Sequence, residues 1–270
     1  MILTIILFII ILGIIVLIHE SGHFLFAKLT GVHVYEFSIG MGPLIFKKIA
    51  KDKTQYSIRA IPIGGFVSLA GEEIDEKKLN KTKGKNLQDK TVFQRFLVMF
   101  MGVGFNFVSA FIILFIAGLV GGAPSTDPIL YDVTENSPAY NAGLNANDKI
   151  LEINDHNITY LEDISLYLAI EDLNKSVEIV AEKPDGSVRT YNIVPEKTIL
   201  EDGNIKYSLG IVLKSNVSDG IIPSVKYAFN EECAIFKQMF VVLGSLFTGG
   251  VELNQLSGPV GIYSIVDQMS

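Results

Sequence analysis

Residues 2–23 of the chain read ILTIILFIIILGIIVLIHESGH. The first 17 of them are aliphatic or phenylalanine, apart from one threonine and one glycine. An α-helix rises about 1.5 Å per residue, so this run extends about 25 Å and nearly fills the hydrocarbon core of a bilayer. We therefore expect a transmembrane helix that continues to Leu29 and ends at Gly31. No basic residues precede the run and no small-residue cleavage site precedes the histidines, so it is expected to stay in the protein and not to be removed as a signal peptide.

The end of this helix carries three residues with metal chemistry, His19, Glu20 and His23. Histidines at positions i and i+4 share one face of a helix, so both imidazoles can bind one Zn²⁺ ion. Glu20 is then expected beside the open coordination position, where it can accept a proton from water. Zinc suits this chemistry because it lowers the pKa of a bound water from about 15.7 to about 7. The expected cofactor is therefore Zn²⁺.

The H-E-x-x-H pattern also arises by chance, and in a soluble surface helix catalysis and coincidence would weigh about equally. Its place in the membrane favours function, because a central Asp, Lys or Arg costs about 2.5 to 3.5 kcal/mol on insertion scales. Three ionisable groups within five residues therefore indicate a metal site. His33 lies beyond the helix end and has no fixed geometry relative to the pair, so we interpret it as a strand side chain.

The charge distribution predicts the topology in the cell membrane. The net charge is −7 overall, but it is +6 from Phe24 to Val98 and −10 from Ala123 to Val225. Basic residues mark cytoplasmic loops, so the first region is expected in the cytoplasm and the second across the membrane. The histidine pair then lies near the cytoplasmic face. The lysines are interleaved with acids and lack aromatic neighbours, so no nucleic-acid partner is expected, and the single Cys233 excludes an intrachain disulfide.

Residues 31–71 are rich in β-branched, aromatic and glycine residues, which predicts hairpins. A sheet that follows a membrane helix can lie at membrane depth if it packs on protein or lines a wet cavity. We favour a membrane-associated β-region beside the metal, with an open edge that can receive an extended peptide. An ordinary cytoplasmic sheet is the alternative. Residues 72–95 are charged and poor in apolar side chains, which indicates a cytoplasmic loop.

Residues 96–123 contain no charged side chain and are long enough for a second, tilted transmembrane helix. Small residues such as Gly102 and Gly104 allow a neighbouring helix to approach closely. Asn106 is the one strongly polar side chain in this stretch. It fits an interhelical hydrogen bond, which is the more common case, or a polar contact with substrate near the metal.

Residues 126–214 are expected to form an acidic soluble domain, with strands near 175–181 and 189–194 and a short helix over 163–173. Within residues 215–270, the segment from Tyr227 to Phe247 is apolar but is broken by Glu231, Glu232 and Lys237. That segment is short for a span, so we interpret it as a helix at the membrane surface or packed on the core.

Six motifs are spread over almost the whole chain. They are His19-Glu20-x-x-His23, Phe37-Ser38-Ile39-Gly40-x-Gly42-Pro43, Pro62-x-Gly64-Gly65-Phe66-Val67, Asn106-Phe107, the stretch from Ala142-Gly143-Leu144 to Asn154, and the turn Leu256-Ser257-Gly258-Pro259-Val260-Gly261. In identity and order they resemble the bacterial site-2 proteases, the intramembrane zinc metalloproteases that cleave membrane-bound anti-sigma factors. This set of motifs is far more specific than H-E-x-x-H alone.

The resemblance implies an α+β membrane protein whose transmembrane helices carry a membrane-associated β-hairpin region and an inserted extracytoplasmic PDZ domain. It implies His19 and His23 as zinc ligands and Glu20 as general base and acid. The implied substrate is the transmembrane segment of a single-pass membrane protein such as an anti-sigma factor, bound as an added strand. Substrate contacts are expected at Gly40, Gly64, Gly65 and Asn106, and at Gly210 in the PDZ carboxylate-binding stretch Leu209-Gly210-Ile211.

The third zinc ligand departs from the family pattern. In the family it is the Asp of a Leu-Asp-Gly motif on a helix after the Ser-Gly-Pro turn, and no such motif occurs before Ser270. Asp267 lacks the motif, and two histidines alone bind zinc weakly. We therefore expect a fragment of a longer protease or a form that cannot cleave by itself. The alternatives are a membrane-anchored PDZ binding module with an incomplete metal site and, less favoured, a metal-dependent membrane chaperone or transport accessory.

Overall fold

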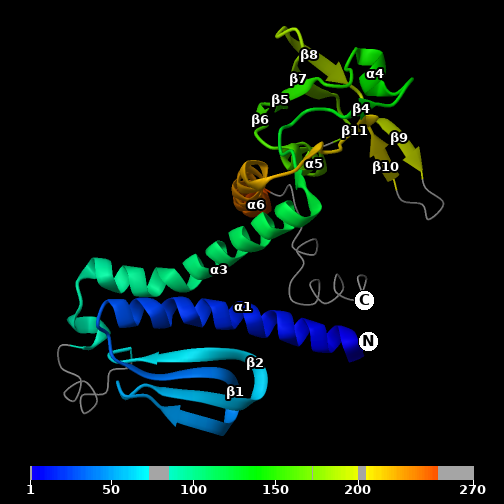
Figure 1. The fold of residues 1–270 in the computed structure, drawn as a ribbon. Coiled ribbons are helices and arrows are strands. Elements are labelled where there is room, and N and C mark those ends of the chain that lie inside the picture. The colour runs from blue at the N-terminus through cyan, green and yellow to red at the C-terminus, as the bar shows by residue number, and fades with distance from the viewer. Residues whose placement is uncertain (1, 73–84, 172, 200–204, 249–270) are drawn as a thin grey trace. The chain divides into compact units, whose positions relative to one another are not determined.

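The computed structural model describes residues 2–72, 85–171, 173–199 and 205–248. Figure 1 shows the order of the helices and strands along the chain. The chain divides into two compact units, with the boundary between Ala110 and Phe111. The predicted turn at 256–261 and Asp267 lie outside the described residues.

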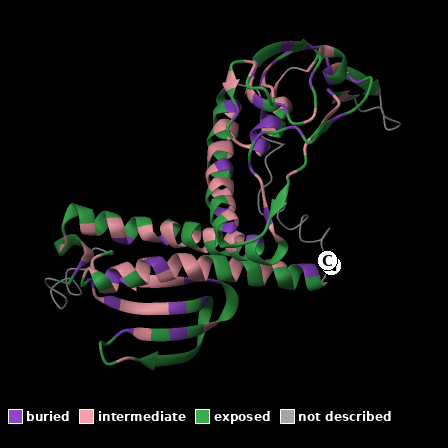
Figure 2. Cartoon of the chain, turned by 45° about the horizontal axis from the view of Figure 1, so that its top comes forward, coloured by how far each residue is buried: buried purple, intermediate pink, exposed green. Residues whose placement is uncertain are grey.

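Helix α1 (Ile2–Leu29) forms over the aliphatic stretch that predicts it. It ends where Gly31 adopts a left-handed conformation, with φ of 70°. Helices α1 and α3 (Val92–Gly121) are the two described helices long and apolar enough to cross a membrane. Only 6% and 11% of the residues in their most apolar stretches are buried, and Figure 2 shows mostly exposed and half-buried residues along both. An apolar surface of this kind fits the predicted contact with lipid.

Helix α3 begins at Val92, four residues before the apolar stretch that predicts it. Thr91 explains the earlier start, because its hydroxyl accepts from the Gln94 N–H at 3.3 Å while the Gln94 side chain accepts from the Thr91 N–H at 3.1 Å. This reciprocal pair is a capping box, which satisfies N–H groups that a helix start leaves open. The polar residues of the first turn therefore belong to the helix.

Strands β1 (Val34–Ile49) and β2 (Gln55–Leu69) form an antiparallel, strongly bent sheet. Residues 36–39 of β1 pair on one side with 65–68 and on the other with 55–58 of β2. Because both strands bend back on themselves, β1 has one part of β2 on each side, and the described residues 65–68 form one edge of the sheet.

The sheet packs against α1 in the first unit. A Cβ added at Gly13 of α1 would lie 3.0 Å from the carbonyl oxygen of Pro62 on β2, so the helix and the strand approach closely. A small core joins these elements to the start of α3, and it contains Ala27, Val32, Val34, Leu69 and Val98. The short 3₁₀ helix η1 (Leu87–Asp89) precedes α3.

The second unit contains a four-stranded sheet in the order β6-β5-β7-β8. The strands are β5 (Lys149–Ile153), β6 (His156–Asn157), β7 (Val177–Glu182) and β8 (Val188–Ile193), and the unit also has helices α4 (Pro138–Ala142) and α5 (Leu161–Ile170). Its described two-stranded ladders are β3 (Ala123–Pro124) with β12 (Val217–Ser218), β4 (Asp132–Val133) with β11 (Ile211–Val212), and β9 (Glu196–Ile199) with β10 (Ile205–Ser208). The core centres on buried residues that include Leu130, Leu144, Ile150, Ile164 and Ile179.

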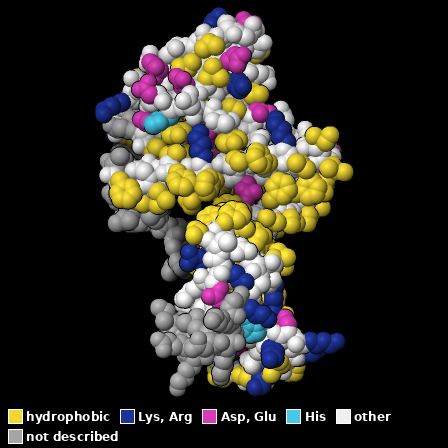
Figure 3. All heavy atoms as spheres, turned by 90° about the vertical axis from the view of Figure 1, so that its left-hand side faces the viewer, with side chains coloured by type: hydrophobic (Ala, Val, Ile, Leu, Met, Phe, Trp, Pro, Cys, Tyr) yellow, Lys and Arg dark blue, Asp and Glu magenta, His cyan; other side chains and the backbone are white. Residues whose placement is uncertain are grey.

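Helix α6 (Ile221–Thr248) follows and has two distinct faces. One face is buried at Ser224, Ala228 and Ala234. Three residues after Ala234, Lys237 donates to the buried carboxylate of Asp163 on α5 at 2.7 Å. The other face exposes large apolar side chains, namely Ile222, Phe229, Phe236, Phe240 and Phe247. Figure 3 shows many hydrophobic side chains at the surface in the view that it draws.

Candidate metal centre

His19 and His23 face each other on α1, as their four-residue spacing predicts. Their Nε2 atoms are 3.1 Å apart, and their rings meet edge to face with the centroids 4.8 Å apart. Two nitrogen ligands at about 2.0 to 2.1 Å from one tetrahedral zinc ion are separated by about 3.3 to 3.4 Å. The pair is therefore set close to the separation that one shared ion requires.

Helix α3 supplies the partners of both imidazoles. Nδ1 of His23 lies 2.7 Å from the carbonyl oxygen of Val98, and Nδ1 of His19 lies 3.4 Å from Nδ2 of Asn106. A carbonyl oxygen only accepts hydrogen bonds, so His23 carries its proton on Nδ1 and presents the lone pair of Nε2 to His19. Ligand histidines in metalloproteins are commonly held in this way through the second ring nitrogen.

Gly102 keeps space open beside both Nε2 atoms. A Cβ added there would contact Nε2 of His23 and would lie 2.8 Å from Nε2 of His19. The two helices also meet closely at Gly22, where an added Cβ would run into the carbonyl oxygen of Met101. A small metal ion therefore fits here, with the two Nε2 atoms as ligands and the space beside Gly102 to hold it.

Glu20 connects this pair to the sheet. Its Oε2 atom accepts a hydrogen bond of 2.9 Å from the backbone N–H of Val67, on the edge segment of β2. The contact fixes the direction of the carboxylate, and it places the edge of the sheet next to the end of α1. That Glu20 lies beside an open coordination position of the metal stays a prediction.

Within the part of the chain that the structure describes, no group of three His, Cys, Asp or Glu side chains could hold a metal ion. His33 does not join the pair, since it lies directly before β1 and its ring contacts that of Tyr35, with the centroids 5.1 Å apart. Burial, and after it the positive charge of Lys28, lowers the pKa of His33. Two histidines are thus the donors that the described structure brings together.

The predicted glycine positions of the sheet have clear backbone reasons. Gly40 and Gly64 have φ of 84° and 79°, which side chains rarely adopt, and they lie where β1 and β2 bend. Gly65 lies close beside β1 in the sheet, because an added Cβ would be 2.5 Å from the carbonyl oxygen of Ser38. Substrate contact at these three positions stays a prediction.

Gly210 lies in the second unit, with φ of 80°, next to Ser137 at the start of α4. It lines a cavity of about 200 Å³ together with Leu168, Leu173, Pro195, Tyr207, Ser208, Leu209 and Ile211. The apolar lining suits an apolar side chain of a peptide. The structure therefore places the predicted Leu209-Gly210-Ile211 stretch in the wall of a cavity.

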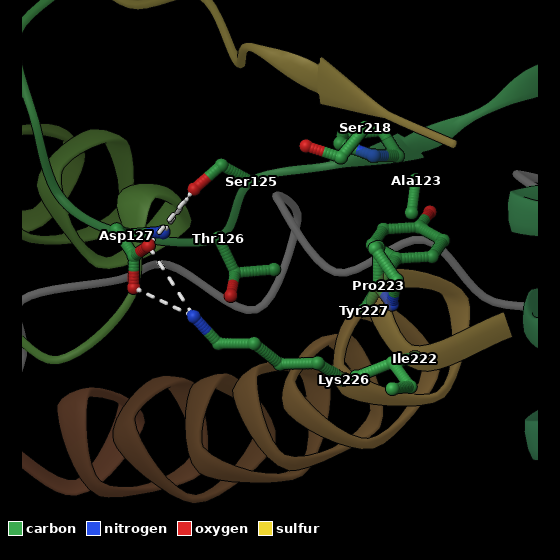
Figure 4. A pocket seen from close by; sticks show the side chains of 10 residues that line it. Ala123, Ser125, Thr126, Asp127, Ser218, Ile222, Pro223, Lys226 and Tyr227 are labelled. Carbon is green, nitrogen blue, oxygen red and sulfur yellow. Dashed lines mark hydrogen bonds and ion pairs between the residues drawn. The ribbon is translucent and has the colours of Figure 1, made fainter. Parts of the chain in front are cut away.

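A second cavity in this unit, of about 260 Å³, lies between β3, β12 and the start of α6 (Figure 4). Its two charged lining residues, Lys226 and Asp127, face each other with Nζ 3.4 Å from Oδ2. They neutralise each other, and the other lining residues are apolar or small and polar. We assign no chemistry to this cavity.

Comparison with protein families identifies the chain. The model of peptidase family M50 matches residues 7–270. The chain belongs to this family. The resemblance to site-2 proteases that the motifs indicate is therefore confirmed.

Several named proteins are similar to this protein over nearly its full chain. A Fusobacterium nucleatum protein named as a zinc metalloprotease is 36% identical over 270 residues, which cover 99% of this chain and 76% of the relative. The zinc metalloprotease RasP of Bacillus licheniformis is 29% identical, with coverage of 99% and 80%. The regulator of sigma-W protease RasP of Bacillus subtilis is 28% identical, with the same coverage. The Fusobacterium nucleatum and Bacillus licheniformis relatives are named zinc metalloproteases, in agreement with the cofactor predicted from the histidine pair.

Among solved structures, the PDZ domain of an SdrC-like protein from Listeria monocytogenes matches 33% of this chain and 88% of that domain. The sequence identity is 20% and the TM-score is 0.28, which is too low a similarity to carry an argument.

The contacts that sequence reasoning missed come mainly from the backbone. The Val98 carbonyl and the Val67 N–H have no side-chain signature, and Gly102 is predicted only as a close-packing residue. One signal was available: Val98, Gly102 and Asn106 recur every four residues on one side of α3, the spacing at which the two histidines recur on α1.

Proposed function

We propose that this chain is a zinc-dependent endopeptidase that cleaves transmembrane segments of single-pass membrane proteins. The observation that carries the proposal is the pair of Nε2 atoms 3.1 Å apart, at the end of an apolar helix and beside the space left by Gly102. Anti-sigma factors are the proposed substrate class, since one relative is named a regulator of sigma-W protease.

His19 and His23 would hold the zinc ion through Nε2, with His23 oriented by Val98. When bound, zinc supplies Lewis acidity and an activated water near neutral pH. Glu20 would accept a proton from the attacking water as general base and would then donate it to the leaving amine as general acid. The Val67 N–H, at 2.9 Å, holds the Glu20 carboxylate in one direction during both transfers.

The edge of the sheet is the proposed binding place for the substrate. A peptide bond inside a helix is hydrogen-bonded and shielded, so a transmembrane substrate must become extended before hydrolysis. Among the described residues, 65–68 of β2 pair with β1 on one side and with no strand on the other, and Val67 turns its N–H away from β1 toward Glu20. A strand added at this edge would lie next to the general base. Gly40, Gly64 and Gly65 shape this edge, and Asn106 lies near the histidines.

The proposed topology is multi-pass, with α1 and α3 spanning the cell membrane, the histidines near the cytoplasmic face and the second unit as an extracytoplasmic PDZ domain. Helix α6 would lie in the membrane surface, because its outer face exposes Ile222 at 82% and Phe247 at 91%. The cavity at Gly210 would receive a C-terminus or limit the size of substrates.

Zinc content and affinity of the chain in detergent test the proposal, together with cleavage of a transmembrane test substrate. His23→Ala should lose zinc, while Glu20→Gln should keep zinc and lose hydrolysis. A longer form that carries the Leu-Asp-Gly helix should bind zinc more tightly and cleave. Retention of tight zinc binding in His23→Ala would refute the assigned ligands.

A second candidate function is a membrane-anchored PDZ binding module. It is favoured by the lack of a third metal-binding side chain among the described residues and by the apolar cavity at Gly210. It predicts that neither form binds zinc and that a peptide with an apolar C-terminus binds to both. A metal-dependent chaperone, in contrast, would retain its activity in Glu20→Gln.

A further inference from the structure

Asn106 has a relation to the histidine pair that neither packing nor substrate binding explains. Its Nδ2 atom lies 3.4 Å from Nδ1 of His19, while its Oδ1 atom is buried and has no hydrogen-bond partner among the described residues. A buried carbonyl oxygen without a donor costs free energy, so its retention next to a metal site requires a reason.

The hydrogen bonds of the structure run in one direction through the pair. Asn106 donates from Nδ2 to Nδ1 of His19, which must then carry its proton on Nε2. That proton points to Nε2 of His23 at 3.1 Å, and His23 in turn donates from Nδ1 to the carbonyl oxygen of Val98 at 2.7 Å. In this chain of bonds Nε2 of His19 has no free lone pair for an ion.

Metal binding requires the opposite tautomer of His19. Nε2 must lose its proton to present a lone pair, so the proton of the neutral ring must be on Nδ1. Two donors, Nδ1–H and the Asn106 NH₂ group, would then face each other. A half-turn of the amide about its last side-chain bond replaces the donor with Oδ1, the atom that has no hydrogen-bond partner among the described residues.

We infer that Asn106 is a positioning residue whose side-chain amide turns over when the metal binds, so that Oδ1 accepts from Nδ1–H of His19. Val98 holds His23 in the metal-binding tautomer with or without metal. Asn106 holds His19 in one tautomer when Nδ2 faces the ring and in the other when Oδ1 faces it. The inference rests on the proposed metal site. It gives Asn106 a role toward the ligand His19 instead of toward the substrate.

Two substitutions separate the donor from the acceptor. Asn106→Asp keeps the shape and provides only acceptor oxygens, whereas Asn106→Leu keeps the volume and provides neither. Ser109→Ala is the matched control, because it removes a polar group one turn further on α3, where the hydroxyl bonds to the backbone oxygen of Asn106 and not to a histidine.

Ring-nitrogen chemical shifts of the ¹⁵N-histidine-labelled chain in detergent report the tautomer without any need for activity. The His19 signals are assigned with His19→Ala. Without metal we expect the proton on Nε2 in the unsubstituted chain and on Nδ1 in Asn106→Asp. Added Zn²⁺ should move it to Nδ1 in the unsubstituted chain, while His23 keeps its proton on Nδ1 throughout.

Zinc affinity gives an independent readout. Asn106→Leu should bind Zn²⁺ about 10- to 100-fold more weakly, as expected on loss of a partner of a ligand histidine. Asn106→Asp should bind at least as tightly as the unsubstituted chain, and Ser109→Ala should bind equally well.

Asn106→Asp that binds no better than Asn106→Leu would overturn the inference, and so would a His19 proton on Nδ1 in the metal-free, unsubstituted chain. Equal zinc affinity of all variants would also overturn it, while leaving the proposed protease intact. If neither the unsubstituted chain nor the longer form binds zinc, the proposed function fails, and the metal-free tautomers still decide whether the amide at position 106 sets His19.

Discussion

Replacing Gly102 with alanine adds one methyl group between the two imidazoles. Carbon contacts are best at about 3.5 Å, and the new Cβ would lie 2.8 Å from Nε2 of His19, so this ring must retreat by about 0.7 Å and His23 must move as well. Inserting one carbon into a packed site costs about 1 to 3 kcal/mol, which corresponds to zinc binding about 5- to 150-fold weaker. The affinity is measured in detergent by competition with a chromophoric chelator.

Gly104→Ala is the control, because it makes the same chemical change two residues later. Its Cβ would meet the flexible side chain of Met101, with the nearest atom 3.1 Å away, and not the histidines. Both substitutions gain about 1 kcal/mol of helix propensity, so this gain cancels in the comparison. Equal zinc affinity of Gly102→Ala and Gly104→Ala, with both chains folded, would refute the reasoning that the space beside Gly102 is the metal position.

Three further predictions concern stability. Gly210→Ala should lower the free energy of unfolding of the second unit by about 1 to 3 kcal/mol or more in thermal unfolding, since the position has φ of 80° and the new Cβ would press on Ser137, which caps α4. Gly186→Ala is the control, because it has φ of 81° and open surroundings, so its loss of stability should come from backbone strain alone. The hydrogen bond from Lys28 lowers the pKa of Asp52 from 3.8 to about 2, so the stabilisation by this pair is present above about pH 4 and is lost as the pH falls toward 2. In Asp52→Asn the free energy of unfolding should therefore depend less on pH between about 4 and about 2. An unchanged pH dependence in this range would contradict the pairing. Lys237→Met should cost about 1.5 to 3 kcal/mol and raise hydrogen exchange in α6, because it leaves a buried carboxylate on α5 without its ammonium partner; unchanged protection of α6 would show that this ion pair does not hold the helix.

The histidine pair could be predicted from the sequence because its geometry is local. Four residues separate His19 from His23, and a single helix fixes their relation regardless of the rest of the fold. The same holds for the end of α1 at Gly31 and for the strands on either side of the turn at Gly186. Patterns within one element carry their own geometry.

The surroundings of the pair could not be predicted in the same way. The Val98 carbonyl lies 75 residues from His23 in the chain and the Val67 N–H lies 47 residues from Glu20, and neither depends on a side chain. Such contacts follow from how α3 and β2 pack against α1, which a periodic pattern does not specify. The early start of α3 was missed for a different reason, since the capping residue Thr91 and its partner Gln94 precede the apolar run.

The ladder between β3 and β12 has a consequence for how this chain can be altered. It pairs Pro124 with Val217 and Ala123 with Ser218, so the two ends of the intervening segment are neighbours about 5 Å apart. A segment whose ends already meet can be removed or exchanged through a short linker, because the closure of the chain is set by the ladder and depends only weakly on the length between its ends. Modules of different size could therefore be grafted at this point while the helix that carries the histidines stays unchanged.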